Sequence, residues 1–191
     1  MLEKNIREQI IELIHQQVVP AVGCTEPMAV ALCTARATEL LGQKPEHISV
    51  LLSANILKNA MGVGIPGTGM IGLPIAIALG ALVGKSEYQL EVIKDLTPVT
   101  LEAGKTFISE NRIDVKLKDG ITEKLYIEIT CEAEGHRATA IIMGTHTNIV
   151  FEEKDGTVLL DKMQPSATAV EKAPLCLNLN TVWEFATTTP V

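Results

Sequence analysis

The stretch LYIEITCEAEGHRATAIIM, residues 125–143, has the pattern of two antiparallel strands joined by a tight turn. Apolar residues at 127, 129 and 131 alternate with polar residues at 128, 130 and 132, which places the apolar side chains on one face of a strand. The pair Gly135-His136 marks a turn, and the run 138–143 predicts the returning strand. This stretch therefore predicts a β-hairpin within a larger antiparallel sheet.

The hairpin continues into a β-meander, and the chain before it is mainly helical. Strands are predicted at 47–53, 148–151 and 158–160, and helices at 2–18, 26–41, 73–83 and 98–110. The fold class is α+β: a helical N-terminal part with a Gly-rich loop, followed by an antiparallel β-meander of four or five strands. We expect a helical segment 1–96, a helix plus meander over 97–165, and the start of a further portion at 166–191. Because WEFATTTPV stops directly after an apolar stretch, we expect the fold to be incomplete at the C-terminus.

Composition excludes several function classes. The chain has 191 residues, 47% of them hydrophobic, and a net charge of −7 with no basic cluster, which argues against nucleic-acid and anionic-membrane partners. The uncharged stretch 59–84 is broken by glycines and is too short to span a bilayer as one helix. The four cysteines match no metal-ligand spacing, so we expect no metal site in this chain, reduced thiols and a cytoplasmic location.

Cys24 lies in the stretch PAVGCTEPMAV, residues 20–30, where Thr25, Glu26 and Pro27 are typical of a helix start. A thiol at a helix N-terminus is stabilised as a thiolate, and its pKa falls below the usual value of about 8.5. Such a thiolate can act as a base, a nucleophile or a metal ligand. The alternative is that Cys24 is a small buried residue beside a helix cap.

The Gly-rich loop GVGIPGTGMIG, residues 62–72, has two interpretations. It contains a G-x-G-x-x-G pattern at 67–72, but no strand directly precedes it and no acidic residue follows on a later strand, as a dinucleotide site needs. The loop is either a tight turn that lets helices pack closely or a nest of backbone N–H groups for a carboxylate or phosphate.

Several polar residues stand near these motifs. Lys58 precedes the loop, and a lysine beside an anion-binding loop suggests a pyridoxal phosphate enzyme as an alternative, with Lys58 forming the Schiff base. Asn55 and Asn59 flank it, and an extended chain would place them on the face opposite Lys58. His136 and His146 fall at predicted turns, and the sequence does not rank them against Lys58 as a second acid or base.

Taken together, the segments resemble the L-cysteine desulfidase family, which is related to the iron–sulfur L-serine dehydratase alpha chain. The matching segments are PAVGCTEPMAVAL, NILKNAMGVGIPGTGMIGLPIAIALGAL, GTHTNIV and WEFATT, in this order along most of the chain. The resemblance implies a lyase that eliminates the β-substituent of L-cysteine, giving sulfide, ammonia and pyruvate, or of L-serine. It implies an acid–base role for Cys24 as a thiolate, and a chain that matches roughly the N-terminal half of such an enzyme.

The same resemblance implies a [4Fe–4S] cluster whose ligands lie in the second half of the enzyme. The chain alone would be inactive, and its exposed apolar surface predicts association with the remaining half or, as a homo-oligomer, with another copy. A non-catalytic small-molecule-binding domain is a further alternative. We expect the amino-acid substrate to contact Thr25, Glu26, Asn55, Lys58, Asn59, Gly67, Thr68, Gly69, His146 and Asn148.

Overall fold

A computed structural model describes residues 2–163 and 177–189 of the chain. The chain divides into two compact units. The smaller unit contains α1 (Lys4–Gln17) and α6 (Leu179–Thr188). The larger unit, residues 21–164, contains the sheet, the remaining helices and the sequence motifs. The segment boundaries predicted at residues 96 and 165 stay a prediction.

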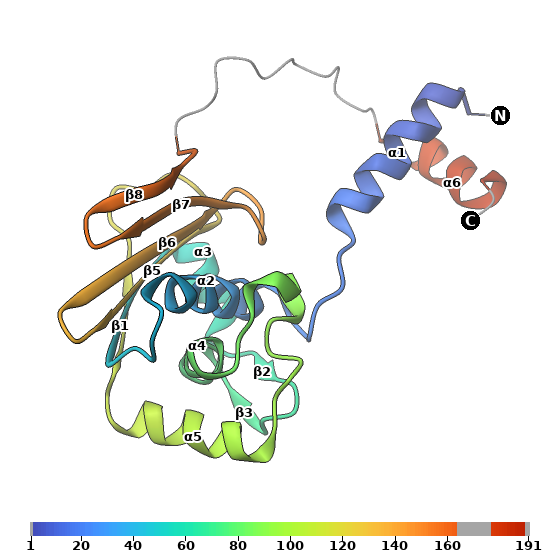
Figure 1. Ribbon diagram of the computed structural model, residues 1–191. Coiled ribbons are helices and arrows are strands. Elements are labelled where there is room, and N and C mark those ends of the chain that lie inside the picture. Colours follow the sequence, from blue (N-terminus) through green and yellow to red (C-terminus); the bar gives the residue numbers. More distant parts are fainter. Residues whose placement is uncertain (1, 164–176, 190–191) are drawn as a thin grey trace. The chain divides into compact units, whose positions relative to one another are not determined.

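The larger unit is built on a six-stranded mixed sheet with the strand order β4-β1-β5-β6-β7-β8 (Figure 1). The predicted meander is confirmed, because β5 to β8 pair in sequence order and antiparallel. The sheet also includes β1, antiparallel to β5, and β4, parallel to β1. The strands are β1 (His47–Leu52), β4 (Ile113–Leu117), β5 (Tyr126–Ala133), β6 (His136–Met143), β7 (Ile149–Lys154) and β8 (Thr157–Asp161).

Helices cover one face of this sheet. The 17-residue helix α2 (Thr25–Leu41) packs on β5 and β6, α4 (Leu73–Leu82) packs on α2, and α5 (Pro98–Ser109) packs on α4 (Figure 1). Close approach of α2 and α4 requires glycine at one position. A Cβ at Gly80 would lie 2.5 Å from the carbonyl oxygen of Ala31, well inside any real contact. The predicted buried helix is thus confirmed, and its small residues allow two helices to pack backbone to backbone.

The core lies between α2, α4 and the inner face of the sheet. Apolar residues at alternate positions of β5, such as Ile127 and Ile129, are fully buried there. Cys33 on α2 and Cys131 on β5 belong to the same core, as expected for thiols that act as small apolar side chains. Cys176 lies outside the described residues.

One ion pair links the helical layer to the sheet. Arg36 on α2 donates to both carboxylate oxygens of Glu152 on β7, at 2.7 and 3.0 Å. Glu152 is only 9% exposed, so its charge is largely removed from water and depends on this guanidinium.

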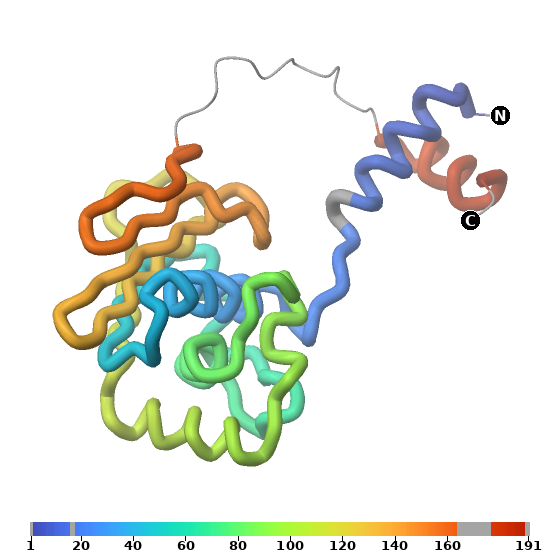
Figure 2. Tube along the Cα trace, viewed as in Figure 1, coloured from blue at the N-terminus to red at the C-terminus, as the bar shows by residue number. Residues whose placement is uncertain are grey.

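The segment after β1 is helical, although the sequence predicted no element there. Its residues form α3 (Ala54–Ala60), which begins at the N-cap Ser53. The Gly-rich loop forms a short hairpin of β2 (Gly64–Ile65) and β3 (Met70–Ile71) (Figures 1 and 2). The Ser53 hydroxyl accepts a hydrogen bond from the backbone N–H of Ile56, and this local capping outweighs the low helix propensity of the two asparagines.

Among the described residues, no helix is long and apolar enough to cross a membrane. The uncharged stretch is divided between α3, the hairpin and the ten-residue helix α4.

Candidate functional site

Cys24 is the N-cap of α2. The helix begins at Thr25, so Cys24 takes the capping position that the sequence had suggested for Thr25. Its backbone is extended, with φ −71° and ψ 137°, and its side chain makes no capping hydrogen bond. The thiol is therefore held at the positive end of α2 but is free to interact with another side chain.

The turn before α2 lies against the Gly-rich hairpin. Gly23 has φ +84°, and a Cβ there would lie only 2.8 Å from Cγ of Pro66. Only glycine fits both the left-handed backbone and this contact. The two sequence motifs, which are far apart along the chain, are thus brought side by side.

A single carboxylate organises the site. The Cys24 thiol donates a hydrogen bond to Oε2 of Glu26 at 3.1 Å, and the Thr25 hydroxyl donates to the same oxygen at 3.2 Å. The side-chain amide of Asn59, on α3, donates to Oε1 at 3.2 Å. Glu26 therefore accepts hydrogen bonds from three side chains on two helical segments, and it links α3 to the start of α2.

These contacts set the protonation of the pair. The hydrogen bond from Cys24 is the largest influence lowering the pKa of Glu26, and the bonds from Asn59 and Thr25 lower it further. Burial raises the pKa of the Cys24 thiol, and its hydrogen bond to the Glu26 carboxylate raises it again. The backbone N–H groups of Glu26 and Thr25 act in the opposite direction but are weaker.

This environment opposes the predicted resting thiolate at Cys24, and the catalytic role of Cys24 stays a prediction. The helix N-terminus does favour the thiolate, but the nearby carboxylate and partial burial disfavour it more strongly. Both shifts favour the state in which the proton lies on the sulfur and the negative charge lies on Glu26. The pair can give one proton from Cys24 and accept one at Glu26.

The three polar residues of α3 lie on one side of the helix. Because the segment is helical, Asn55, Lys58 and Asn59 are spaced i, i+3 and i+4 and share one helix face, so the opposite-face arrangement expected for an extended chain does not occur. All three are exposed. Only Asn59 among them contacts the carboxylate of Glu26 through a hydrogen bond in the described part of the chain.

The hairpin uses its polar side chain internally. The hydroxyl of Thr68 donates to the carbonyl of Ile65 at 2.7 Å and accepts from the backbone N–H of Met70 at 2.9 Å. Thr68 is only 7% exposed, whereas Gly67 and Gly69 are exposed. The side chain of Thr68 thus stabilises the turn, and contacts to a substrate at this loop would come from the exposed glycine backbone.

The remaining predicted residues lie elsewhere in the larger unit. His146 and Asn148 lie in the loop between β6 and β7, where the Asn148 amide donates to the carbonyl of Met143 at 3.0 Å. His136 pairs with Asp155 at 2.9 Å at the turn between β5 and β6. In the described residues, no hydrogen bond joins these histidines to the Cys24–Glu26 pair.

The described residues do not fit an iron–sulfur cluster. Cys33 and Cys131 are buried in the core, and burial raises the pKa of both thiols, that of Cys131 to about 12. An iron ligand must be a thiolate, which this environment opposes. Within residues 2–163 and 177–189 no three His, Cys, Asp or Glu side chains gather as a metal site.

A groove adjoins the site on the side of the hairpin. It has a volume of about 450 Å³, and its walls include Val22, Pro66, Gly67, Leu96 and Leu101. One hairpin residue of this wall, Pro66, is the residue that contacts Gly23 in the turn before α2. Most of the wall is apolar, so the groove suits the uncharged part of a small molecule.

Sequence reasoning named Glu26 only as a substrate contact and missed its role as the partner of Cys24. The available signal was that Glu26 follows Cys24 by two residues at the start of a predicted helix. In an N-cap position the side chain points back over the first turn, where residue N2 can meet it.

Comparison with known proteins finds UPF0597 proteins similar to this chain. No family model matches the chain. A UPF0597 protein of Bacteroides fragilis is 64% identical over 190 residues, which cover 100% of this chain and 44% of that protein. A UPF0597 protein of Bacteroides thetaiotaomicron is 62% identical with the same coverage, and one of Aeromonas hydrophila is 43% identical over 95% of this chain and 42% of its own length.

These relatives correct the resemblance drawn from the motifs. The proteins that match the whole chain are UPF0597 proteins, so assignment to the L-cysteine desulfidase family and to the N-terminal half of a serine dehydratase alpha chain is wrong. The chain spans about 44% of the length of these curated relatives. It is similar over its whole described length to UPF0597 proteins, and that similarity carries no activity with it.

Proposed function

We propose that Cys24 and Glu26 form the acid–base pair of a lyase that eliminates the β-substituent of a small L-amino acid, L-cysteine or L-serine. The observation that supports it is the hydrogen bond of 3.1 Å from the Cys24 thiol to a carboxylate that two other side chains hold in place. A β-elimination requires a base for the α-proton and an acid for the leaving group, and one such pair supplies both.

The proton balance follows from the resting state. The α-proton goes to Glu26, the electron pair of the broken Cα–H bond forms the Cα=Cβ double bond, and the β-substituent leaves with the proton of Cys24. The β-substituent departs as hydrogen sulfide or water, and the rest of the substrate becomes 2-aminoacrylate. Water then converts 2-aminoacrylate to pyruvate and ammonia. Transfer of the proton from Glu26 to the Cys24 sulfur then restores the pair. No oxidant or reductant is consumed.

The neighbouring residues have matching roles in this proposal. Asn59 is a positioning residue, because it holds Oε1 of Glu26 and so turns Oε2 toward the thiol. Gly67 and Gly69 are exposed on the hairpin whose Pro66 contacts Gly23, and their backbone N–H groups would bind the substrate carboxylate. The apolar groove lined by Val22 and Leu96 takes the rest of the molecule.

Because the described residues do not fit a [4Fe–4S] cluster, no step is assigned to one. We also propose a cytoplasmic location, which the free thiols of Cys24, Cys33 and Cys131 favour. The alternative with Lys58 as a pyridoxal phosphate Schiff base has less support, since Lys58 is exposed on α3.

The test is turnover by the whole protein purified without oxygen. Sulfide and pyruvate release from L-cysteine, and pyruvate release from L-serine, are measured for the wild type, Cys24→Ser and Glu26→Gln. We expect the wild type to turn over and each variant to lose at least about 100-fold in kcat, the usual effect of removing an acid or base. Cys33→Ala is the matched control, because it removes a buried thiol that lies away from the pair.

Three results would contradict the proposal. Wild-type rates in both variants would show that the pair is structural. Bleaching of a yellow protein by borohydride, together with loss of activity in Lys58→Ala, would favour the pyridoxal phosphate alternative. Absence of turnover with every β-substituted amino acid tried would favour a non-catalytic binding domain.

A further inference from the structure

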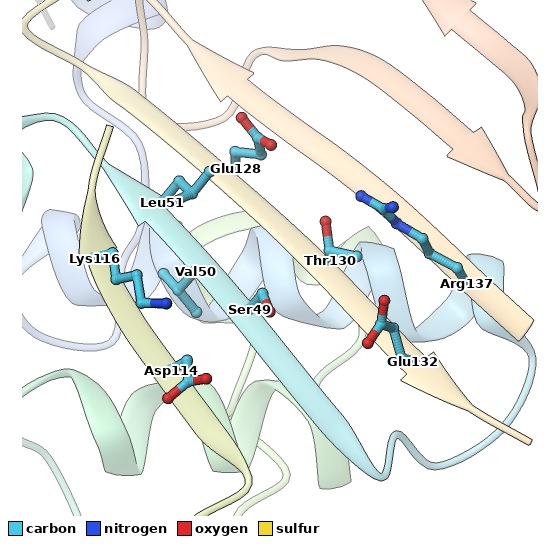
Figure 3. Close-up of a pocket in the computed structure, with 9 residues that line it drawn as sticks. All are labelled: Ser49, Val50, Leu51, Asp114, Lys116, Glu128, Thr130, Glu132 and Arg137. Carbon is cyan, nitrogen blue, oxygen red and sulfur yellow. The ribbon is translucent and has the colours of Figure 1, made fainter. Parts of the chain in front are cut away.

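The sheet face opposite the helices carries a polar hollow. It has a volume of about 280 Å³ and lies across β4, β1, β5 and β6 (Figure 3). Its floor consists of the small side chains of Ser49 and Thr130, which are directly opposite each other on β1 and β5. The hollow exists because these small residues lie between rows of long charged ones. It is separate from the Cys24 site, which lies on the helix side of the sheet.

Two cations reach over this floor from opposite sides. Lys116 on β4 pairs with the residue two positions after Ser49 on β1. Arg137 on β6 pairs with the residue two positions after Thr130 on β5, which lies toward the opposite end of the hollow because β1 and β5 are antiparallel. Figure 3 shows both side chains extending toward the centre, with Ser49 and Thr130 between them. Glu132, opposite Arg137 on β5, borders the same end of the hollow.

The acids around the hollow differ in whether they are already paired. Glu128 binds Lys118 at 2.7 Å and the Tyr126 hydroxyl at 2.6 Å, and Asp114 lies 3.4 Å from His47. In contrast, the side chains of Lys116, Arg137 and Glu132 make no ion pair or hydrogen bond within the described residues. The hollow therefore has two uncommitted cations and one uncommitted anion.

A buried hydroxyl adds a further donor. Thr130 and Thr139 are each 6% exposed, and their hydroxyls share one hydrogen bond of 3.0 Å. Either hydroxyl can be the donor of this bond, so one of the two protons is available for a further acceptor in the hollow. Ser49, half-buried beside them, has no side-chain hydrogen bond in the described residues. These hydroxyls can therefore donate to an oxygen of a ligand, as they can to water.

We propose that this hollow binds a small α-amino acid with a second acidic group. Such a ligand has two anions and one cation, the complement of Lys116, Arg137 and Glu132. One acid would bind the guanidinium of Arg137 in the two-pronged manner that planar carboxylates allow, and the other would bind Lys116. The ammonium group would bind Glu132, and the free hydroxyls would donate to the ligand's oxygens.

The test is calorimetric titration of the whole protein at fixed salt with L-aspartate, L-glutamate and O-phospho-L-serine. Succinate, which lacks the ammonium group, and L-alanine, which lacks the second acid, are the comparison ligands. We expect each comparison ligand to bind at least about tenfold more weakly than the best of the three, since a hydrogen-bonded charge pair is lost. No binding by any of the three would overturn the proposal.

Variants locate the site and separate its parts. Arg137→Gln and Lys116→Gln should each weaken binding at least about tenfold, whereas Lys105→Gln on α5 should leave it unchanged. Glu132→Gln should weaken the binding of L-aspartate but leave the binding of succinate unchanged or make it tighter. Equal loss for both ligands in Glu132→Gln, or binding that survives Arg137→Gln, would overturn the assignment. Binding that persists in Cys24→Ser would confirm that the hollow is distinct from the acid–base pair.

Discussion

Replacing Glu26 by glutamine should make Cys24 more reactive toward an alkylating agent, although it removes a hydrogen-bond partner. The carboxylate lies 3.1 Å from the sulfur, and its charge opposes formation of the thiolate. Two unit charges 4 Å apart repel by about 1 kcal/mol in water and about 4 kcal/mol at an effective dielectric constant of 20. The pair is only partly buried, so we use a value near the lower limit, about 1.4 kcal/mol, which raises the thiolate fraction about tenfold at neutral pH.

The net change in rate is smaller than the change in thiolate fraction. A thiolate with a lower pKa is also a weaker nucleophile, with a Brønsted coefficient of about 0.4–0.5, and this removes roughly a factor of three. We therefore expect iodoacetamide to alkylate Cys24 about threefold faster in Glu26→Gln at pH 7. We also expect the midpoint of the pH–rate curve to move to lower pH, because the group that raised the thiol pKa is gone.

The assay is mass-spectrometric mapping of the alkylated peptide that contains Cys24, which separates it from the other thiols. Asn55→Ala is the matched control for a polar change nearby, since Asn55 shares the helix face of Asn59 but does not contact Glu26 in the described residues. An unchanged or slower rate in Glu26→Gln, with the midpoint fixed, would show that the carboxylate does not control the thiol.

Three further predictions concern stability. Arg36→Met should lower the free energy of unfolding by about 3–5 kcal/mol, because it leaves the buried charge of Glu152 unpaired. The double variant Arg36→Met/Glu152→Leu should recover most of the loss. Urea denaturation measures both variants, and equal losses would contradict a buried ion pair. Gly23→Ala should destabilise the fold more than Gly135→Ala in the same assay. Both glycines have positive φ, so each substitution costs about 1–2 kcal/mol for the backbone alone, but only a Cβ at residue 23 would lie 2.8 Å from the hairpin. Equal losses of stability would refute the steric argument. The folded-state pKa of Glu26 lies below its ordinary value of 4.5, so its contribution to stability is present above that value and is lost as the pH falls through the folded pKa. Glu26→Gln should therefore flatten this part of the acid unfolding curve. An unchanged curve would show that the hydrogen bonds to Glu26 do not contribute to stability.

The fold was largely predictable where the local pattern is strong. The alternation in residues 125–143 predicted β5 and β6, and the apolar run after the Gly-rich loop predicted α4. No element was predicted at residues 54–60, where local capping by Ser53 and burial of Ile56 produced a helix. The face on which Lys58 lies therefore stayed open at the sequence level, because a strand and a helix distribute neighbouring side chains over different faces.

The candidate site was predictable in its residue types but not in its protonation. Cys24 at a helix start is visible in the sequence, and the expected effect of the helix dipole is correct in sign. The larger effects come from burial and from the position of the Glu26 carboxylate, which Asn59 on another helix helps to fix. A pKa depends on all charges and solvent within a few ångströms, and a sequence does not give those distances.

The sequence by itself determined the elements: the meander, the buried helix α4 and a cysteine at the start of α2. These follow from periodicity and capping, which act between residues close along the chain. Only the tertiary structure decided that β4 and β1 join the meander, that Gly23 lies against Pro66, and that Lys116, Arg137 and Glu132 border one hollow. The physical reason is that strand pairing and helix packing join segments whose order in the sequence sets no distance between them, so the chemistry of both sites arises only when the sheet and its helices have assembled.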